Sequence, residues 1–367
     1  MEEKEMLENG IDNYIQRIKK CKEIYLELLE NMPEKSNEKI YTIQNRDTFN
    51  LIISSFNPAL KQENAKEDLM QVYDIGIHYK TKALIIANKG ATLYSLTEKY
   101  EKPFLVRHIG LCIYMPGLGL EYVNAGIVGN VYDKPIILRT ESACAPSFIF
   151  GSQRCNCHYQ WKNIKELASS FNTFQEPDIT DGDEFEKWVQ KQYKYENGRH
   201  IYNQKSDVGV VMLHLDSQNG MGSGFTENEF AFDLTERAAI RHRGEYTSEQ
   251  AFNTTMLGGF TAIGLEGDPR GSSNYRGYCI TPIVLDFLGV NKNVIMLTNN
   301  KGKISKMEGF GYNIKRVKSI GAVNVAGSTE ATQRHTEFNH MDISGDFVTF
   351  GEDYERIKAE IEEIIKG

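Results

Sequence analysis

Residues 280–317 decide the fold of this chain, and they read ITPIVLDFLGVNKNVIMLTNNKGKISKMEGFGYNIKRV. The apolar stretch 280–289 ends at a glycine, which is typical of a buried helix with a glycine cap. The apolar run that begins at 293 leads into the polar turn Thr-Asn-Asn at 298–300. Residues 303–311 then predict a helix and residues 313–317 a further strand. Strand and helix alternate here, so we expect an α/β layered domain of mixed α and β content.

The rest of the chain is consistent with this expectation. Residues 83–88 (ALIIAN) and 208–215 (VGVVMLHL) are apolar runs that predict buried strands. Between residues 103 and 140, β-rich segments separated by Gly, Pro or Asp predict a meandering sheet. Apolar residues at near-helical spacing predict helices over 3–32 and 227–243 and an amphipathic helix over the last fifteen or so residues.

Composition excludes some classes of protein. The chain has 367 residues, of which 40% are hydrophobic and 25% charged, with a formal net charge of −8. This acidic balance argues against binding to a nucleic-acid polymer, because such proteins carry basic surfaces. The sequence has no apolar run long enough for a transmembrane helix, and its acidic start lacks the apolar core of a signal peptide. We therefore expect a cytoplasmic protein without a membrane partner.

The most informative motif is a cluster of cysteines. Cys144, Cys155 and Cys157 follow the spacing C-x10-C-x-C. Cysteines clustered in a reducing compartment favour a metal site over disulfides. Three thiolates suit Zn2+ and leave a fourth position open for a water molecule, as in catalytic sites. Two alternatives stay open: a structural zinc completed by His158, whose side chain is adjacent to that of Cys157, and cysteines that bind no metal.

Two segments together resemble a known family. The first is RTESACAPSFIFGSQRCNCHYQW at 139–161, and the second is LGVNKNVIMLTNNKGKISKMEGFGYNIKRV at 288–317. In this order they resemble GTP cyclohydrolase II of riboflavin biosynthesis, and the likeness extends over residues 103–325. The resemblance implies a zinc-dependent hydrolase that opens the imidazole ring of GTP and releases formate and pyrophosphate. It also implies that the protein is a homodimer.

The resemblance assigns roles to particular residues. One zinc ion per chain would be bound by Cys144, Cys155 and Cys157, and Mg2+ would bind with the nucleotide phosphates. Asp268 would transfer a proton and Arg270 would act at the α-phosphate, although an Asp and an Arg two residues apart also form ordinary turn salt bridges. The predicted contacts to the nucleotide are Arg139, Gln160, Gln218, Asn219, Gly220, Thr298 and Lys303.

The sequence departs from the family at two places. A Gln-Glu-Gly-Arg segment, whose Glu reads the guanine edge, becomes Gln-Asn-Gly-Met at 218–221. Asn219 both donates and accepts hydrogen bonds, whereas a carboxylate only accepts them. The position of the family's catalytic Tyr falls on Ala238, with Tyr246 as the main rival for the missing hydroxyl. The zinc ligands are therefore kept, while the wall that reads the base differs.

Three hypotheses follow for the function. The first is a zinc-dependent cyclohydrolase acting on GTP or a related purine nucleotide. The second is a paralogue that acts on another nucleotide, such as a pyrimidine of the uracil-degradation type. The third is a catalytically inactive, zinc-stabilised nucleotide-binding protein. The predicted organisation is an N-terminal helical or mixed extension (1–102), a GTP cyclohydrolase II-like domain (103–327) and a C-terminal tail with its amphipathic helix (328–367).

Overall fold

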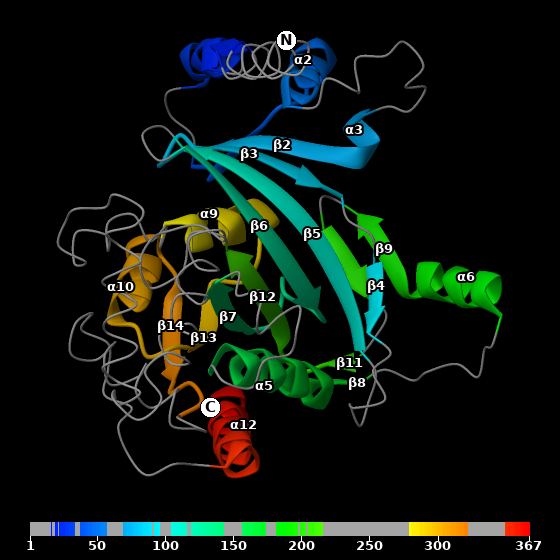
Figure 1. Ribbon diagram of the computed structural model, residues 1–367, viewed down its shortest axis with the longest axis vertical. Helices are drawn as coiled ribbons and strands as arrows, with labels where there is room; N and C mark the ends of the chain where they lie inside the picture. The colour runs from blue at the N-terminus through cyan, green and yellow to red at the C-terminus, as the bar shows by residue number, and fades with distance from the viewer. Residues whose placement is uncertain are drawn as a thin grey trace, which may run out of the picture. The chain divides into compact units, whose positions relative to one another are not determined.

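The structure is a computed structural model of the 367-residue chain. It describes residues 16, 19–20, 22–33, 37–56, 69–89, 92–95, 104–115, 119–142, 156–173, 181–196, 199–202, 205–215, 279–321 and 349–367. The chain divides into two compact units. Unit 1 comprises Met1–Gly90 and Ile109–Glu121, and unit 2 comprises Ala91–His108 and Tyr122–Gly367. The strands β5 (Phe104–Met115) and β6 (Gly119–Val128) contribute residues to both units (Figure 1).

Unit 1 is built on an antiparallel sheet. Its strands are β1 (Ile40–Thr42), β2 (Tyr73–His78), β3 (Leu84–Asn88) and the second half of β5, hydrogen-bonded in that order. Helices α2 (Arg46–Phe56) and α3 (Leu69–Val72) and the helical residues 22–30 complete it. The predicted strand at 83–88 is confirmed as β3. The predicted helix at 3–32 is helical at each described position from 16 to 30.

Isoleucines dominate the core of unit 1. Ile75 and Ile77 of β2 are fully buried, and Ile52 of α2 is 2% exposed. Tyr25 closes this core, and its hydroxyl donates to the backbone oxygen of Lys82 at 2.5 Å. Burial, with a smaller contribution from Tyr114, raises the pKa of Tyr25 to about 12. The folded state therefore favours the neutral form of the Tyr25 phenol.

Unit 2 contains sheet strands that are parallel on one side of the sheet. Strands β12 (Gly209–Leu215), β7 (Ile136–Ser142), β13 (Asn293–Leu297) and β14 (Asn313–Val317) pair in that order, all in parallel, and β14 is the edge strand. We call these four strands the parallel block. On its other side, β12 pairs antiparallel with β6, and β4 (Thr92–Ser95) pairs antiparallel with β5. The mixed α/β class expected from the sequence is therefore observed.

The order of these strands corrects the expected meander. Strands β6 and β7 follow each other in the chain, yet β12 lies between them and pairs with both. Six of the seven residues of β12 are buried. A strand that is apolar on both faces gains most free energy at a central position of a covered sheet, and β12 takes that position.

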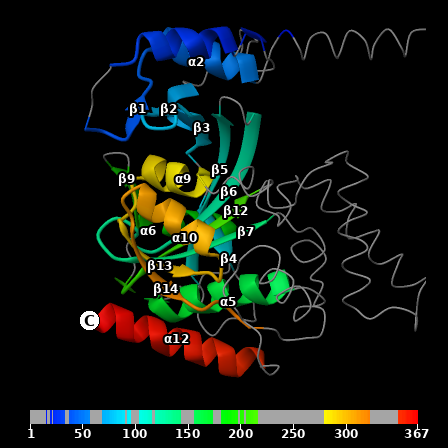
Figure 2. The same cartoon turned by 90° about the vertical axis from the view of Figure 1, so that its left-hand side faces the viewer.

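Helices cover both faces of the parallel block. Helices α9 (Ile280–Leu288) and α10 (Lys301–Gly309) lie on one face, and α5 (Asn156–Phe171) and α12 (Phe350–Lys366) lie on the other (Figure 2). The elements predicted within 280–317 are confirmed, including the glycine cap. Gly289 ends α9 with φ 67°, in the left-handed region that favours glycine.

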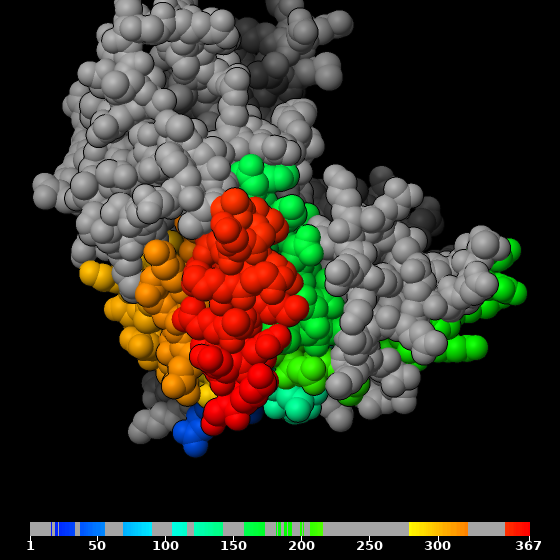
Figure 3. All heavy atoms as spheres, turned by 90° about the horizontal axis from the view of Figure 1, so that it is seen from below, coloured from blue at the N-terminus to red at the C-terminus, as the bar shows by residue number. Residues whose placement is uncertain are grey.

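The C-terminal helix is an integral part of unit 2. Ile357 and Ile361 of α12 are fully buried in the same core cluster as Ile164 and Leu167 of α5. Seen from below, α12 lies between α5 and the residues of α10 and β14 (Figure 3). A capping box between Thr349 and Glu352 begins the helix. The predicted amphipathic helix is confirmed, and its apolar face closes the core.

Short elements complete unit 2. Strands β8 (Asn172–Thr173) and β11 (Lys205–Ser206) pair, as do β9 (Tyr193–Glu196) and β10 (Arg199–Tyr202), and α6 spans Gly182–Gln192. The helix predicted at 227–243 lies outside the described residues. Of the helices that the structure does describe, none is both long and apolar enough to cross a membrane.

Candidate active site

Several predicted motifs follow strands that end at the same edge of the sheet. Parallel strands end on the same side, and ligands of α/β sheets bind outside these carboxyl ends. Here β7 ends two residues before Cys144, β12 ends three residues before Gln218, and β13 ends directly before Thr298. Three segments that were identified separately in the sequence therefore start from the carboxyl edge of the parallel block.

Helix α5 brings a fourth segment to this edge. Cys157 lies in its first turn, one turn before Gln160 and Trp161. The Gln160 amide donates to the Ser319 hydroxyl at 3.4 Å and to the backbone oxygen of Ile320 at 3.2 Å, just beyond the end of β14. The Trp161 ring meets the ring of His214, near the end of β12, edge-on at 5.6 Å between centroids. The first turns of α5 therefore lie against the carboxyl ends of β14 and β12.

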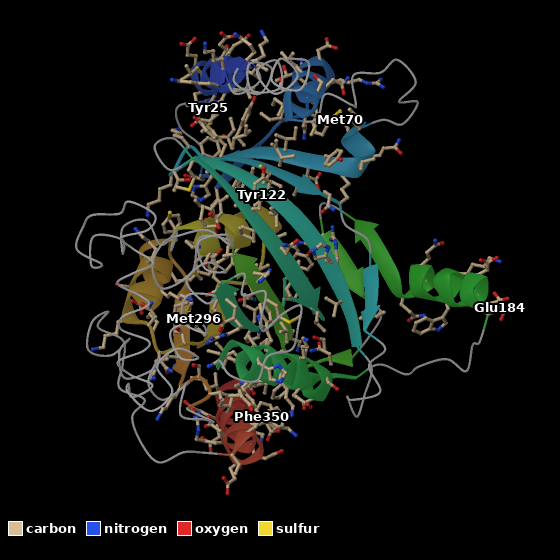
Figure 4. The ribbon with its side chains drawn as sticks, in the orientation of Figure 1. Tyr25, Met70, Tyr122, Glu184, Met296 and Phe350 are labelled. Atoms are coloured by element: carbon tan, nitrogen blue, oxygen red, sulfur yellow. The ribbon has the colours of Figure 1, made fainter. Side chains whose placement is uncertain are left out.

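Helix α12 holds α5 in this position from the other side. Phe350 lies at the start of α12 (Figure 4). Its ring lies 6.0 Å from that of Tyr159, and the ammonium of Lys162 lies 4.1 Å from its ring centre. The hydroxyls of Tyr354 and Ser170 are hydrogen-bonded at 2.6 Å. These contacts extend along α5 from its first turn to its last, so α12 restrains the orientation of the whole helix.

Arg139 is tied to the protein at the carboxyl edge. One terminal nitrogen of its guanidinium donates to the backbone oxygen of Leu297 at 2.6 Å, and the other forms an ion pair with Glu141. Both side chains are buried, at 11% and 10% exposure. A buried guanidinium keeps its charge when a carboxylate pairs with it. The predicted nucleotide contact therefore lies at this edge with its charge balanced by Glu141.

The Thr-Asn-Asn turn after β13 begins helix α10. The Asn300 carboxamide oxygen accepts from the backbone N–H groups of Gly302 and Lys303, and the Thr298 hydroxyl accepts from the N–H of Asn300 at 3.0 Å. The Lys303 ammonium donates to the Thr140 hydroxyl at 2.8 Å. Thr298 and Lys303 are thus brought to the same edge as Arg139 and Gln160, with Lys303 on the α10 side of β7.

A second basic side chain stands at this edge, beside the same turn. Arg316 donates to the backbone oxygen of Thr298 at 3.0 Å and to the Asn299 amide oxygen at 3.2 Å. Burial lowers the pKa of Arg316, nearby Glu360 opposes this shift and Arg356 adds to it. An arginine has a very high ordinary pKa, so Arg316 stays charged at neutral pH. Lys303 and Arg316 make this edge suitable for an anionic ligand.

Polar side chains from neighbouring strands and the turns after them form a row that the sequence did not reveal. Asn124 is the register partner of His214 and His214 is that of Glu141, while Asn299 and Ser319 follow two residues after β13 and β14 end. The His108 and Asn124 side chains are hydrogen-bonded at 2.9 Å, as are Asn299 and Ser319 at 3.1 Å. We call these the polar row: His108, Asn124, His214, Glu141, Asn299 and Ser319.

The polar row marks the limit of the apolar core. Towards the opposite edge on the same face, these strands carry core residues such as Val210, Met212, Ile137 and Ile295. Each member of the polar row comes from a different strand or strand end, so in the sequence of that strand it looks like an ordinary position. Only strand pairing and side-chain hydrogen bonds between distant residues bring them together, although the change from Val-Val-Met-Leu to His within β12 was a detectable signal.

Most of the remaining predicted site residues lie outside the described residues. These are Cys144, Cys155, Gln218, Asn219, Gly220, Asp268 and Arg270, together with Ala238 and Tyr246. Of Cys157, the structure describes the backbone. Within the described part of the chain, no group of three or more His, Cys, Asp or Glu residues is arranged to hold a metal ion.

Two described elements next to the predicted zinc ligands meet at one residue. Glu141, three residues before Cys144, is the register partner of His214. Trp161, four residues after Cys157, contacts the same histidine. Strand β7 and helix α5, the described elements next to these cysteines in the chain, therefore both lie beside His214. Three thiolates are a donor set that suits Zn2+, and the zinc site itself stays a prediction.

A comparison with known protein families adds no assignment, since no family model matches this chain.

Proposed function

We propose that this protein is a zinc-dependent cyclohydrolase that opens the base ring of a nucleotide, with GTP or a related purine nucleotide as the first candidate. The proposal includes a GTP cyclohydrolase II-like fold for the catalytic domain, and a homodimer. One observation carries it: the segments that bear Cys144, Cys157, Gln218 and Thr298 all begin at or lie against the carboxyl edge of the parallel block.

The chemistry follows from the residues at this edge. Cys144, Cys155 and Cys157 would hold zinc, which when bound supplies a water whose pKa is lowered to about 7. A ring carbon between two nitrogens is electrophilic enough for attack by such a nucleophile. Asp268 would accept or deliver protons during this attack, and Arg270 would bind the α-phosphate through its planar fork.

The nucleotide phosphates require positive charge, and the edge provides it. Lys303 and Arg316 are cationic, and Mg2+ would neutralise further charge on the phosphates. Arg139 is already balanced by Glu141, so its contribution is a fixed guanidinium at the carboxyl end of β7. Gln160 and Thr298 add neutral hydrogen-bonding groups close by.

A second candidate rests on the altered base-reading segment. Asn219 suits the mixed donor and acceptor edge of uracil better than it suits the two adjacent donors of guanine. Met221 also removes a positive charge that the family carries. These two residues favour a paralogue that opens a pyrimidine ring, and Ala238 favours an inactive binding protein as a third outcome.

A nucleotide panel separates these candidates. Purified protein of known zinc content is incubated with purine and pyrimidine nucleotides and Mg2+, and formate, pyrophosphate and new ultraviolet-absorbing products are measured. Formate or a ring-opened product from GTP supports the purine enzyme, and turnover of a pyrimidine alone supports the paralogue. Tight nucleotide binding without turnover supports the inactive protein, and a chain that binds neither zinc nor nucleotide contradicts all three.

A further inference from the structure

The middle of the polar row is occupied by a histidine that the resemblance does not assign. His214 is the sixth residue of β12 and follows the core residues Val210 and Met212 on the α5 side of the sheet. A half-buried imidazole at this position interrupts an otherwise apolar strand. Imidazole is the side chain most often used for proton transfer near neutral pH.

Residues from three elements lie next to His214. Asn124 of β6 and Glu141 of β7 are its register partners on the two adjacent strands, and Trp161 of α5 contacts it edge-on. Side chains directly opposite on neighbouring strands have Cβ atoms about 5 Å apart. Among the residues that the structure describes, the charged or titratable neighbours are Glu141, with Arg139 paired to it, and His108 through its hydrogen bond to Asn124.

The position of His214 links it to the predicted zinc site. The segment leading to Cys144 leaves β7 next to it, and the helix turn that carries Cys157 directly precedes the turn with Trp161. The Glu141 carboxylate is already engaged in its ion pair with Arg139. Among the described residues of the polar row, His214 is therefore the side chain best suited to deliver a proton beside the cysteine segments.

We propose that His214 protonates the departing ring nitrogen during ring opening, and that Asn124 and Glu141 position its imidazole. The inference rests on the proposed cyclohydrolase function. The oxygen of water bonds to the ring carbon and its proton passes to solvent. The carbon–nitrogen bond breaks with its electron pair on nitrogen, and that nitrogen takes a proton from the imidazolium. Solvent then returns a proton to His214, so the net reaction adds one water.

The role also explains a departure from the family. Ala238, which stands where the family has its catalytic Tyr, has no group that exchanges protons. His214 supplies one from the sheet itself, on a strand held by hydrogen bonds to both neighbours. A proton donor on a rigid strand keeps its orientation without help from the segments that follow the strands.

The test compares His214→Gln with the wild type and with His78→Gln, a control that removes a buried histidine from unit 1. Zinc per chain and the Kd of GTP with Mg2+ are measured with kcat on the nucleotide that the wild type turns over. We expect His214→Gln to keep zinc and nucleotide binding while kcat falls about 10²- to 10⁴-fold. His78→Gln should retain kcat per folded chain.

Imidazole rescue provides a second measurement. In His214→Ala, added imidazole should restore part of kcat, and the far-ultraviolet circular dichroism shows whether the variant is folded. Wild-type kcat in His214→Gln, loss of zinc from it, or no rescue of folded His214→Ala would overturn the inference and leave the cyclohydrolase proposal standing. A wild type that holds zinc but turns over no nucleotide would instead overturn the proposed function, and this inference with it.

Discussion

Unit 1 and unit 2 both contain a covered sheet with an aliphatic core, but they connect their strands differently. In unit 1 the chain turns back after β2 and pairs β3 antiparallel beside it, so the connection is short and forms one tight turn. In unit 2 the strands β12, β7, β13 and β14 all run the same way, and the chain leaves each of them at one edge. Parallel strands therefore bring together segments that are far apart in the sequence, whereas the hairpin brings together only segments that are close in the sequence.

The two units also differ in how they carry charge. The Lys89–Asp74 pair of unit 1 is 3.8 Å apart, with side chains 27% and 35% exposed. The Arg139–Glu141 pair of unit 2 is only about one-third as exposed and lies at the carboxyl edge. Burying an ion pair costs solvation free energy, so a fold tolerates it where the charges are held in place. The more deeply buried ion pair therefore lies in unit 2, at the edge where we propose that the chemistry takes place.

The largest expected effect is on metal binding. Cys155→Ser or Cys157→Ser should lose most of the zinc and lower turnover to background, because two thiolates are too few to hold the ion. Cys112→Ser, on the part of β5 that belongs to unit 1, is the matched control and should keep close to one zinc per chain. Metal analysis of the three purified variants measures this, and full zinc occupancy in both Cys155→Ser and Cys157→Ser would remove the zinc assignment.

The next effect concerns the two ion pairs. Glu141→Leu leaves the Arg139 guanidinium buried without its carboxylate, which should lower the free energy of unfolding by about 3–5 kcal/mol. Asp74→Leu removes the exposed pair of unit 1 and should cost at most about 1 kcal/mol. Chemical denaturation followed by circular dichroism gives both values. Equal losses would show that the Arg139–Glu141 pair is no more buried in solution than the other.

Two core substitutions separate the roles of the units. Ile77→Ala in unit 1 and Ile357→Ala in α12 each remove a fully buried side chain, and each should lower stability by about 2–5 kcal/mol. Ile357→Ala should also release zinc faster to a chelator, because α12 restrains α5, whose first turn holds Cys157. If Ile357→Ala released zinc at the wild-type rate, or if Ile77→Ala released it faster, the two units would not differ in their effect on the zinc site.

The smallest effect is the alkaline stability of unit 1. The pKa of Tyr25 is raised from 10 to about 12 in the folded protein, so its contribution is complete below pH 10 and is lost as the pH rises through 12. Tyr25→Phe has no proton to lose and should flatten this part of the stability profile. Denaturation midpoints between pH 9 and pH 12 test it, and an unchanged slope in Tyr25→Phe would assign the alkaline loss to another group.

Local patterns in the sequence determined much of unit 2. The helix that ends at Gly289, the strand before the Thr-Asn-Asn turn and the following helix and strand were all predictable from residues 280–317. Residues that are close in sequence set apolar period, capping and turn chemistry, so these features can be read without the fold. The spacing of the three cysteines is equally local and predicts a zinc site that awaits its test.

The tertiary structure alone decided how these pieces meet. It placed β12 between β6 and β7, aligned His214 with Asn124 and Glu141, and joined α12 to the core of unit 2. Strand order and register depend on contacts between residues far apart in the chain, and a shift of one residue would turn each polar side chain to the other face. Such contacts are chosen by the free energy of the whole packed domain, which no single segment of the sequence contains.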